Sequence, residues 1–179
     1  MEVVKMIHYI LSAIVLISLG LIYYIYLFNK FQDCLVRLEE ATLNITSLLN
    51  KKFDLLNKAV EVMKTQKKIK EEPLKKIAEL TIRQADDNAL NQAFNEFNII
   101  TIDNPQLLKN KTYHTFYNSL NDTEEQLIAL KKYYNNILIT YNKLVRCWPT
   151  KIVAIIKAFK EKEFYDSVHH GLTTKNEGE

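Results

Sequence analysis

Residues 7–28 read IHYILSAIVLISLGLIYYIYLF and contain no Asp, Glu, Lys or Arg. At about 1.5 Å per residue, a helix of this length extends for roughly 33 Å, enough to cross a hydrocarbon core of about 30 Å. No small-x-small cleavage site follows before Lys30, because the stretch ends in bulky residues: Tyr23, Tyr24, Tyr26, Leu27 and Phe28. The sequence therefore predicts an uncleaved transmembrane anchor over residues 1–28, in preference to a signal peptide or a buried core helix.

The rest of the chain has the composition of one helical domain. Of the 179 residues, 47% are hydrophobic and 25% are charged, and there are only three Gly and three Pro. So few turn-forming residues predict long helices with few connections. The net charge of +3 is too small to indicate a nucleic-acid partner, so none is predicted.

Apolar residues recur at helical spacing directly after the anchor. Residues 29–70 contain neither Gly nor Pro, and a stripe with steps of three and four runs along them, interrupted by Lys52: Phe31, Leu35, Leu38, Thr42, Ile45, Leu49, Leu56, Ala59 and Met63. This period predicts a helix that continues out of the anchor and packs one face against other helices.

A second helix is predicted from Pro73 to Phe97, because proline is favoured in the first turn of a helix. Its predicted inner face consists mostly of small residues, namely Leu74, Ala78, Thr81, Ala85, Ala89, Ala93 and Phe97. Residues 98–110 contain Asp103, Asn104 and Pro105 and are predicted to form a connection.

The third predicted helix has the most regular pattern. Its stripe alternates steps of three and four without a slip, as in a bundle or coiled coil: Tyr113, Phe116, Leu120, Thr123, Leu127, Leu130, Tyr134, Ile137, Tyr141, Leu144 and Trp148. Trp148-Pro149 is predicted to end this helix. Thr150 is predicted to cap a short fourth helix over residues 151–159, with an inner face of Ile152, Ile155, Ile156 and Phe159.

These patterns together predict an all-α fold. An N-terminal transmembrane helix (residues 1–28) is followed by a long antiparallel bundle of three long helices plus a short C-terminal helix (residues 29–165). Residues 166–179 are predicted to be a disordered polar tail.

No arrangement of residues typical of catalysis occurs in the sequence. The four histidines lack carboxylate or cysteine partners at ligand spacing, and the three glycines are too scattered for a phosphate-binding loop. Cys34 and Cys147 fit no metal or redox motif. We therefore predict no catalytic residues, no cofactor and no metal site.

One local pattern is a candidate site. Tyr134-Asn135 and Tyr141-Asn142 lie seven residues apart, on one face of the third helix. Asparagine is a poor helix former, so two of them in mid-helix require an explanation. Either their amides bond a packed neighbour, which is the favoured interpretation, or they form a polar groove for a partner.

The order of several motifs resembles the signature of the LemA family. That signature contains TE, RxYN, YN and FP elements, and the counterparts here are Thr123-Glu124, Tyr133-Tyr134-Asn135-Asn136, Tyr141-Asn142 and Trp148-Pro149-Thr150. Residues 104–107 (NPQL) are similar to the family's YPxL element, and residues 51–56 (KKFDLL) are similar to its RRxDLI element. The family arginines are replaced here by lysines (Lys51, Lys52 and Lys131), and its phenylalanine by Trp148, as in a divergent member.

The resemblance implies a membrane anchor, a long antiparallel helical bundle, an extracellular N-terminus and a cytoplasmic bundle. It implies no enzyme activity and no catalytic residues. Lys5 on one side of the anchor, against Lys30 and Arg37 on the other, gives the same orientation a modest charge bias.

Three functions are compatible with the sequence. The leading hypothesis is a single-pass protein of the cell membrane that acts as a scaffold or interaction protein, with a protein partner and candidate contact residues Tyr134, Asn135, Tyr141, Asn142, Trp148 and Pro149. The alternatives are a tethering coiled coil that oligomerises and an enzyme with a site in a groove between helices. Convergence of reactive groups from separate helices would favour the enzyme.

Overall fold

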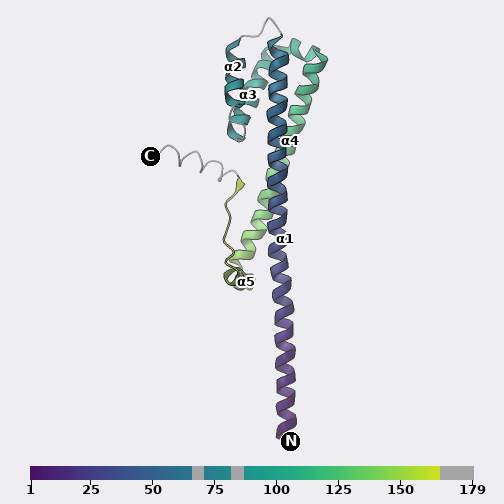
Figure 1. Cartoon of the computed structure of the whole chain (residues 1–179), viewed down its shortest axis with the longest axis vertical. Coiled ribbons are helices and arrows are strands. Elements are labelled where there is room, and N and C mark those ends of the chain that lie inside the picture. Colours follow the sequence, from purple (N-terminus) through teal and green to yellow (C-terminus); the bar gives the residue numbers. More distant parts are fainter. Residues whose placement is uncertain (66–70, 82–86, 166–179) are drawn as a thin grey trace, which may run out of the picture. The chain divides into compact units, whose positions relative to one another are not determined.

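The computed structural model is all-α and describes residues 1–65, 71–81 and 87–165 (Figure 1). In chain order the helices are α1 (Glu2–Lys64), α2 (Glu71–Thr81), α3 (Asp87–Asp103), the 3₁₀ helix η1 (Pro105–Lys109), α4 (Lys111–Arg146) and α5 (Thr150–Ile156). No strand occurs among these residues. The predicted fold class is confirmed, including an apolar N-terminal helix that is long enough to cross a membrane.

The chain forms two compact units, and α1 and α4 contribute to both. Unit 1 consists of Met1–Glu39 and Asn136–Glu163, and unit 2 consists of Glu40–Asn135 and Phe164–Glu179. The predicted division into residues 1–28, 29–165 and 166–179 rests on hydropathy and composition, not on contacts between residues, and stays a prediction. The predicted polar tail, residues 166–179, lies outside the described residues.

The packed part of unit 1 centres on Phe31. This side chain is fully buried and lies 4.9 Å from Phe159 between ring centroids, and its ring meets Tyr141 edge to face at 6.0 Å. Phe28 stacks on Phe159 as well, at 6.4 Å. Aromatic pairs at these distances add to the stabilisation from burial. They hold the segment after α5 against α1.

Unit 2 contains the larger core, to which α1, α2, α3, η1 and α4 all contribute. Its fully buried side chains are those of Ile45, Leu56, Ala59, Met63, Ile77, Leu90, Ala93, Phe97, Tyr113, Leu120 and Leu127, each at most 1% exposed. All the α1 and α4 residues in this set belong to the predicted stripes. The stripes therefore identify the inward faces of both long helices within this unit, except at Thr42, which is exposed.

The second helix differs from its prediction. In place of one helix from Pro73 to Phe97, the structure has α2 and α3, with residues 82–86 outside the described part of the chain. The predicted connection also begins too early, because α3 continues to Asp103. Buried Ile100 and Thr101 extend its inner face, and Asn104 then closes the helix with its Nδ2 group donating to the carbonyl oxygen of Ile100.

The predicted inner face of the C-terminal helix is right at Phe159, which packs on Phe28 and Phe31, and wrong at its three isoleucines. Val153 and Ala154 are buried, whereas Ile152, Ile155 and Ile156 are 50%, 70% and 62% exposed. Thr150 does not cap α5, since its hydroxyl donates to the carbonyl oxygens of Leu144 and Cys147 at the end of α4. The helix has only seven residues, and two turns are too short for periodicity to decide which side faces inward.

Candidate functional site

The Tyr141-Asn142 pair lies in unit 1 and binds the backbone of the extended segment after α5. The Tyr141 hydroxyl donates to the carbonyl oxygen of Lys160 at 3.0 Å. The Asn142 amide donates to the carbonyl oxygen of Lys162 at 2.8 Å and accepts from the N–H of Lys162 at 3.0 Å. Two adjacent side chains thus satisfy backbone groups that no helix or sheet ladder satisfies.

The Tyr134-Asn135 pair makes a related contact in unit 2. Asn135 Oδ1 accepts from the N–H of Tyr165 at 3.1 Å, and the Tyr134 ring packs edge to face on the Tyr165 ring at 5.7 Å. Burial raises the pKa of both Tyr134 and Tyr141. Both phenols therefore stay neutral at physiological pH.

The last two candidate residues, Trp148 and Pro149, are joined by a cis peptide bond between α4 and α5. Trp148 is 81% exposed, although the stripe predicted that it faces inward. Because α4 ends at Arg146, the helical period no longer applies at residue 148. The role of the six candidates as contact residues stays a prediction.

A buried charge network, which the sequence did not predict, connects three helices of unit 2. Lys52 on α1 donates to Glu124 on α4 and, at 2.7 Å, to Asn91 Oδ1 on α3. Asn91 in turn donates to Asp87 at 3.3 Å, and Asp87 accepts from Lys131 on α4. The network contains two cations and two carboxylates, so its charges balance.

Lys52 has no solvent exposure, and its Nζ lies 4.9 Å from the ring centroid of Phe94. Burial lowers the pKa of the Lys52 ammonium, and the hydrogen bond and charge of Glu124 oppose that shift. An isolated buried ammonium is costly, whereas one with a carboxylate and an amide oxygen as acceptors is tolerated. The sequence signal was available, because Lys52 occupies an inward position of the α1 stripe and a family arginine position.

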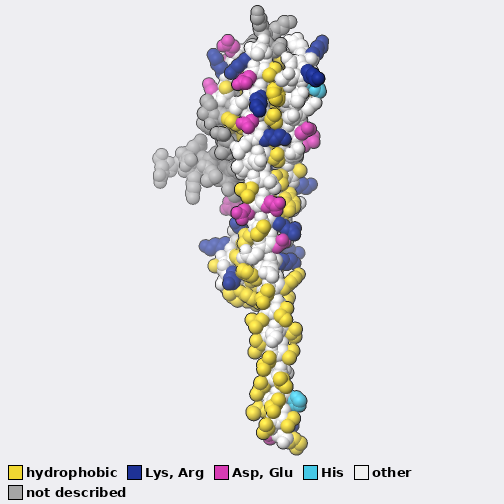
Figure 2. Space-filling model, turned by 45° about the vertical axis from the view of Figure 1, so that its right-hand side comes forward, with side chains coloured by type: hydrophobic (Ala, Val, Ile, Leu, Met, Phe, Trp, Pro, Cys, Tyr) yellow, Lys and Arg dark blue, Asp and Glu magenta, His cyan; other side chains and the backbone are white. Residues whose placement is uncertain are grey.

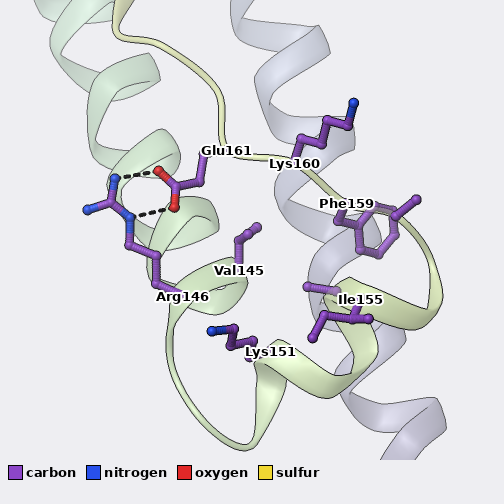
Figure 3. A pocket seen from close by; sticks show the side chains of 9 residues that line it. Val145, Arg146, Lys151, Ile155, Phe159, Lys160 and Glu161 are labelled. Carbon is purple, nitrogen blue, oxygen red and sulfur yellow. Dashed lines mark hydrogen bonds and ion pairs between the residues drawn. The ribbon is translucent and has the colours of Figure 1, made fainter.

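Two surface clefts of about 490 Å³ each complete the candidate features. The cleft of unit 1 lies beside α5, where the Arg146 guanidinium and the Glu161 carboxylate face each other (Figure 3). Ile155 and Phe159 line its apolar part. The cleft of unit 2 lies between α1 and α4, and its lining residues are Asn44, Ser47, Leu48, Gln126, Ala129, Leu130 and Tyr133.

The side chains of these features present apolar surface, amides and charges, and the pairs Lys52 with Glu124, Lys131 with Asp87 and Arg146 with Glu161 form ion pairs. No group of three or more His, Cys, Asp or Glu side chains that could hold a metal ion occurs among residues 1–65, 71–81 and 87–165.

These observations define an all-α protein with one N-terminal helix that is long and apolar enough to cross a membrane. The model of the LemA family matches residues 41–176, which is most of the chain. The chain therefore belongs to the LemA family, as its motifs predicted. A search of curated proteins finds no match to it.

Proposed function

We propose that this protein is a single-pass scaffold or interaction protein of the cell membrane, without enzyme activity. One observation carries the membrane part of the proposal. Between Ile7 and Tyr26 the side chains of α1 face outward, including Ile14 at 53%, Leu16 at 70% and Ile22 at 64% exposed. Figure 2 shows hydrophobic side chains covering the visible face of this part of the helix. Exposing so large an apolar surface to water costs free energy, whereas the hydrocarbon core of a bilayer accommodates it.

Charge supports an orientation with the N-terminus outside and the part of the chain after Phe28 in the cytoplasm. The part of unit 1 that follows α4 residue 135, residues 136–163, contains six Lys and Arg residues but only two Glu. In the structure Lys157 reaches the ring of Phe28 at the end of the apolar stretch, with Nζ 5.3 Å from the centroid. Cations at this end of the span favour the cytoplasmic side.

A binding role is supported by the pairing of the buried charged side chains of unit 2. Lys52 and Glu124 pair with each other, as do Lys131 and Asp87. A catalytic acid or base must be accessible to a substrate, whereas these four charged groups are engaged in ion pairs with each other. The cleft between α1 and α4 presents apolar and amide surface instead, which suits a protein partner.

Anchoring is tested by extracting membranes that contain the full chain with alkaline carbonate. The protein should stay in the pellet. Leu16→Arg combined with Leu19→Arg should release it, because two charges near the bilayer centre cost several kcal/mol. Asn118→Arg combined with Glu125→Arg is the matched control and should stay in the pellet. Release of the unmodified chain would refute the anchor.

Orientation is tested with a cysteine-free chain that carries either Glu2→Cys or Lys109→Cys. Lys109 is preferred to its neighbour Asn110, because Asn110 Oδ1 accepts from the N–H groups of Thr112 and Tyr113 at the start of α4. A membrane-impermeant thiol reagent should label intact cells at position 2 and leave position 109 unlabelled until lysis. The reverse pattern would overturn the orientation.

The scaffold part is tested by placing a photo-crosslinking residue at Gln126, in the cleft of unit 2, or at exposed Lys132 as the control. A protein partner in the cleft should give an adduct of defined mass from position 126 only. An adduct of twice the 21.0 kDa chain would favour the oligomerising tether instead. The absence of any adduct in native membranes would contradict both.

A further inference from the structure

The outward face of α5 is apolar, which is the reverse of what a helix on a soluble domain normally presents. Three isoleucines, Ile152, Ile155 and Ile156, are each at least half exposed, whereas the smaller Val153 and Ala154 face inward. Trp148, two residues before the helix, is 81% exposed. Four large apolar side chains thus gather on one short segment, and exposed apolar clusters mark surfaces that another phase or molecule covers.

The position of this segment within unit 1 identifies what covers it. Phe159, three residues after α5, lies between Phe28 and Phe31 of α1, with ring centroids 6.4 Å and 4.9 Å away. Phe28 is the last residue of the uncharged stretch that we propose as the membrane span. The segment is therefore fixed against α1 beside Phe28, where the span ends. Figure 1 shows α5 beside α1.

The polar residues around α5 suit the same surroundings. Lys151, Lys157 and Lys160 are exposed and flank the isoleucines, and Arg146 is paired with Glu161. Lysine stems can lie along an apolar boundary while the ammonium reaches headgroup phosphates. Tryptophan beside isoleucines and lysines on a short amphipathic segment is the composition of an element that lies in a membrane surface.

We propose that α5 and Trp148 form a second membrane contact, which rests on the proposed anchor. Trp148, Ile152, Ile155 and Ile156 enter the boundary between headgroups and acyl chains of the bilayer that α1 crosses. The contact is continuous with the span through Phe28 and Phe159. It would hold the part of unit 1 outside the span, residues 29–39 and 136–163, at the membrane surface.

The chain contains a single tryptophan, so Trp148 itself is the reporter. The full-length protein is reconstituted into phosphatidylcholine vesicles that contain about a quarter of phosphatidylglycerol. Tryptophan fluorescence is then measured with lipids brominated either near the headgroup or near the chain end. We expect shallow bromine to quench Trp148 at least twofold more than deep bromine, and aqueous iodide to quench it little.

Side-chain dependence is tested with the triple variant Ile152→Ser, Ile155→Ser, Ile156→Ser. It should lose most of the bromine quenching and gain iodide quenching. The matched control replaces two other exposed apolar residues of unit 1, Val36→Ser and Ile139→Ser, and should behave like the unmodified chain. Equal quenching in the triple variant and the control would overturn the proposal.

A second reporter separates failure of this contact from failure of the anchor. Trp148→Phe combined with Leu16→Trp places the only tryptophan in the middle of the proposed span. If deep bromine quenches residue 16 while Trp148 in the unmodified chain responds to iodide and not to bromine, the anchor holds and the α5 contact is refuted. If neither position is quenched by bromine, both proposals fall.

Discussion

The side-chain amide of Asn142 makes two hydrogen bonds to the backbone of Lys162: Nδ2 donates to the carbonyl oxygen at 2.8 Å, and Oδ1 accepts from the N–H at 3.0 Å. A neighbouring strand in a sheet satisfies backbone groups in the same way. Residues 159–164, which follow α5, lie in no helix or strand. The position of this segment in unit 1 therefore depends on side chains of α4 and on the aromatic contacts of Phe159. Removing such side chains tests how firmly the segment is held.

Asn142→Ala should destabilise the protein in detergent micelles by about 1 kcal/mol. Two hydrogen bonds contribute roughly 1–3 kcal/mol, and the better helix propensity of alanine returns about half a kcal/mol. Hydrogen exchange at the Lys162 amide should accelerate markedly. Asn136→Ala, on an exposed position of the same helix, should leave that exchange rate unchanged. Equal exchange rates in both variants would show that the Asn142 bonds do not hold the segment.

Lys52→Met should cost roughly 2–4 kcal/mol in the free energy of unfolding, because it leaves the Glu124 carboxylate and the Asn91 amide oxygen without their donor. The expected loss is moderate for a buried pair because the Glu124 side chain keeps 23% exposure. Denaturant titration of the full chain measures it. Lys51→Met, one residue away and exposed, should change stability by less than about 0.5 kcal/mol. A similar loss in both variants would contradict the network.

Phe31→Ala should destabilise unit 1 by about 3–5 kcal/mol, since the ring is fully buried and contacts both Tyr141 and Phe159. Amides of residues 159–162 should lose protection in hydrogen exchange before those of unit 2 do. Val36→Ala removes an apolar side chain that is 61% exposed and should have little effect. Unchanged protection in Phe31→Ala would show that the aromatic contacts do not position the segment.

Stability should fall as the pH rises from about 10 to 12, because burial raises the pKa of Tyr113 to about 12 against an ordinary value of 10. A raised folded-state pKa means that the unfolded chain loses this proton first, so the contribution is complete below pH 10 and is lost towards pH 12. The pKa of Lys52 lies below its ordinary value of 10.5, so this residue by itself makes stability rise with pH in the range just below 10.5.

The Tyr113 contribution is isolated by comparing the unmodified chain with Tyr113→Phe, which should show a shallower fall over this range. Thermal melting at several pH values measures stability, and tyrosinate absorbance follows ionisation. Identical pH profiles for the two proteins would contradict the prediction.

A maleimide should modify Cys147 faster than Cys34 in the folded protein at pH 7. Cys147 is exposed, whereas Cys34 is buried and its burial raises the pKa of its thiol, which lowers the reactive thiolate fraction. Mass spectrometry of the singly modified protein identifies the site. Equal modification rates of Cys34 and Cys147 in the native protein would contradict this arrangement. So would a slower modification of Cys34 after denaturation than before it.

The sequence predicted the fold class and the inward faces of the long helices, because many turns repeat the same signal. The stripe of α4 from Tyr113 to Leu144 is buried or half-buried throughout. The role of the Tyr-Asn pairs as a partner site stays a prediction. The partners of those asparagines, Lys162 and Tyr165, were not predictable, since an amide can bond any backbone group that reaches it.

Short elements and buried charge were the places where sequence patterns failed. Ile152, Ile155 and Ile156 were predicted to face a protein core but are exposed, because hydrophobicity alone does not show whether an apolar side chain is buried within its own domain. Lys52 was treated as an interruption of the α1 stripe, although it is inward-facing and fully buried. Its burial depends on Glu124, which lies 72 residues further along the chain.

The buried network restricts how this part of the sequence can change over generations. Replacing Lys52 or Glu124 alone lowers the free energy of unfolding by several kcal/mol, which is a large share of the about 5–15 kcal/mol that typically keeps a domain folded. A fully apolar replacement therefore requires several substitutions that are each harmful until the others are present. Exchanges that keep the sign of each charge, such as lysine for arginine, remain open as single steps, so drift at these positions should alter the chemistry of the cation long before it removes the charge.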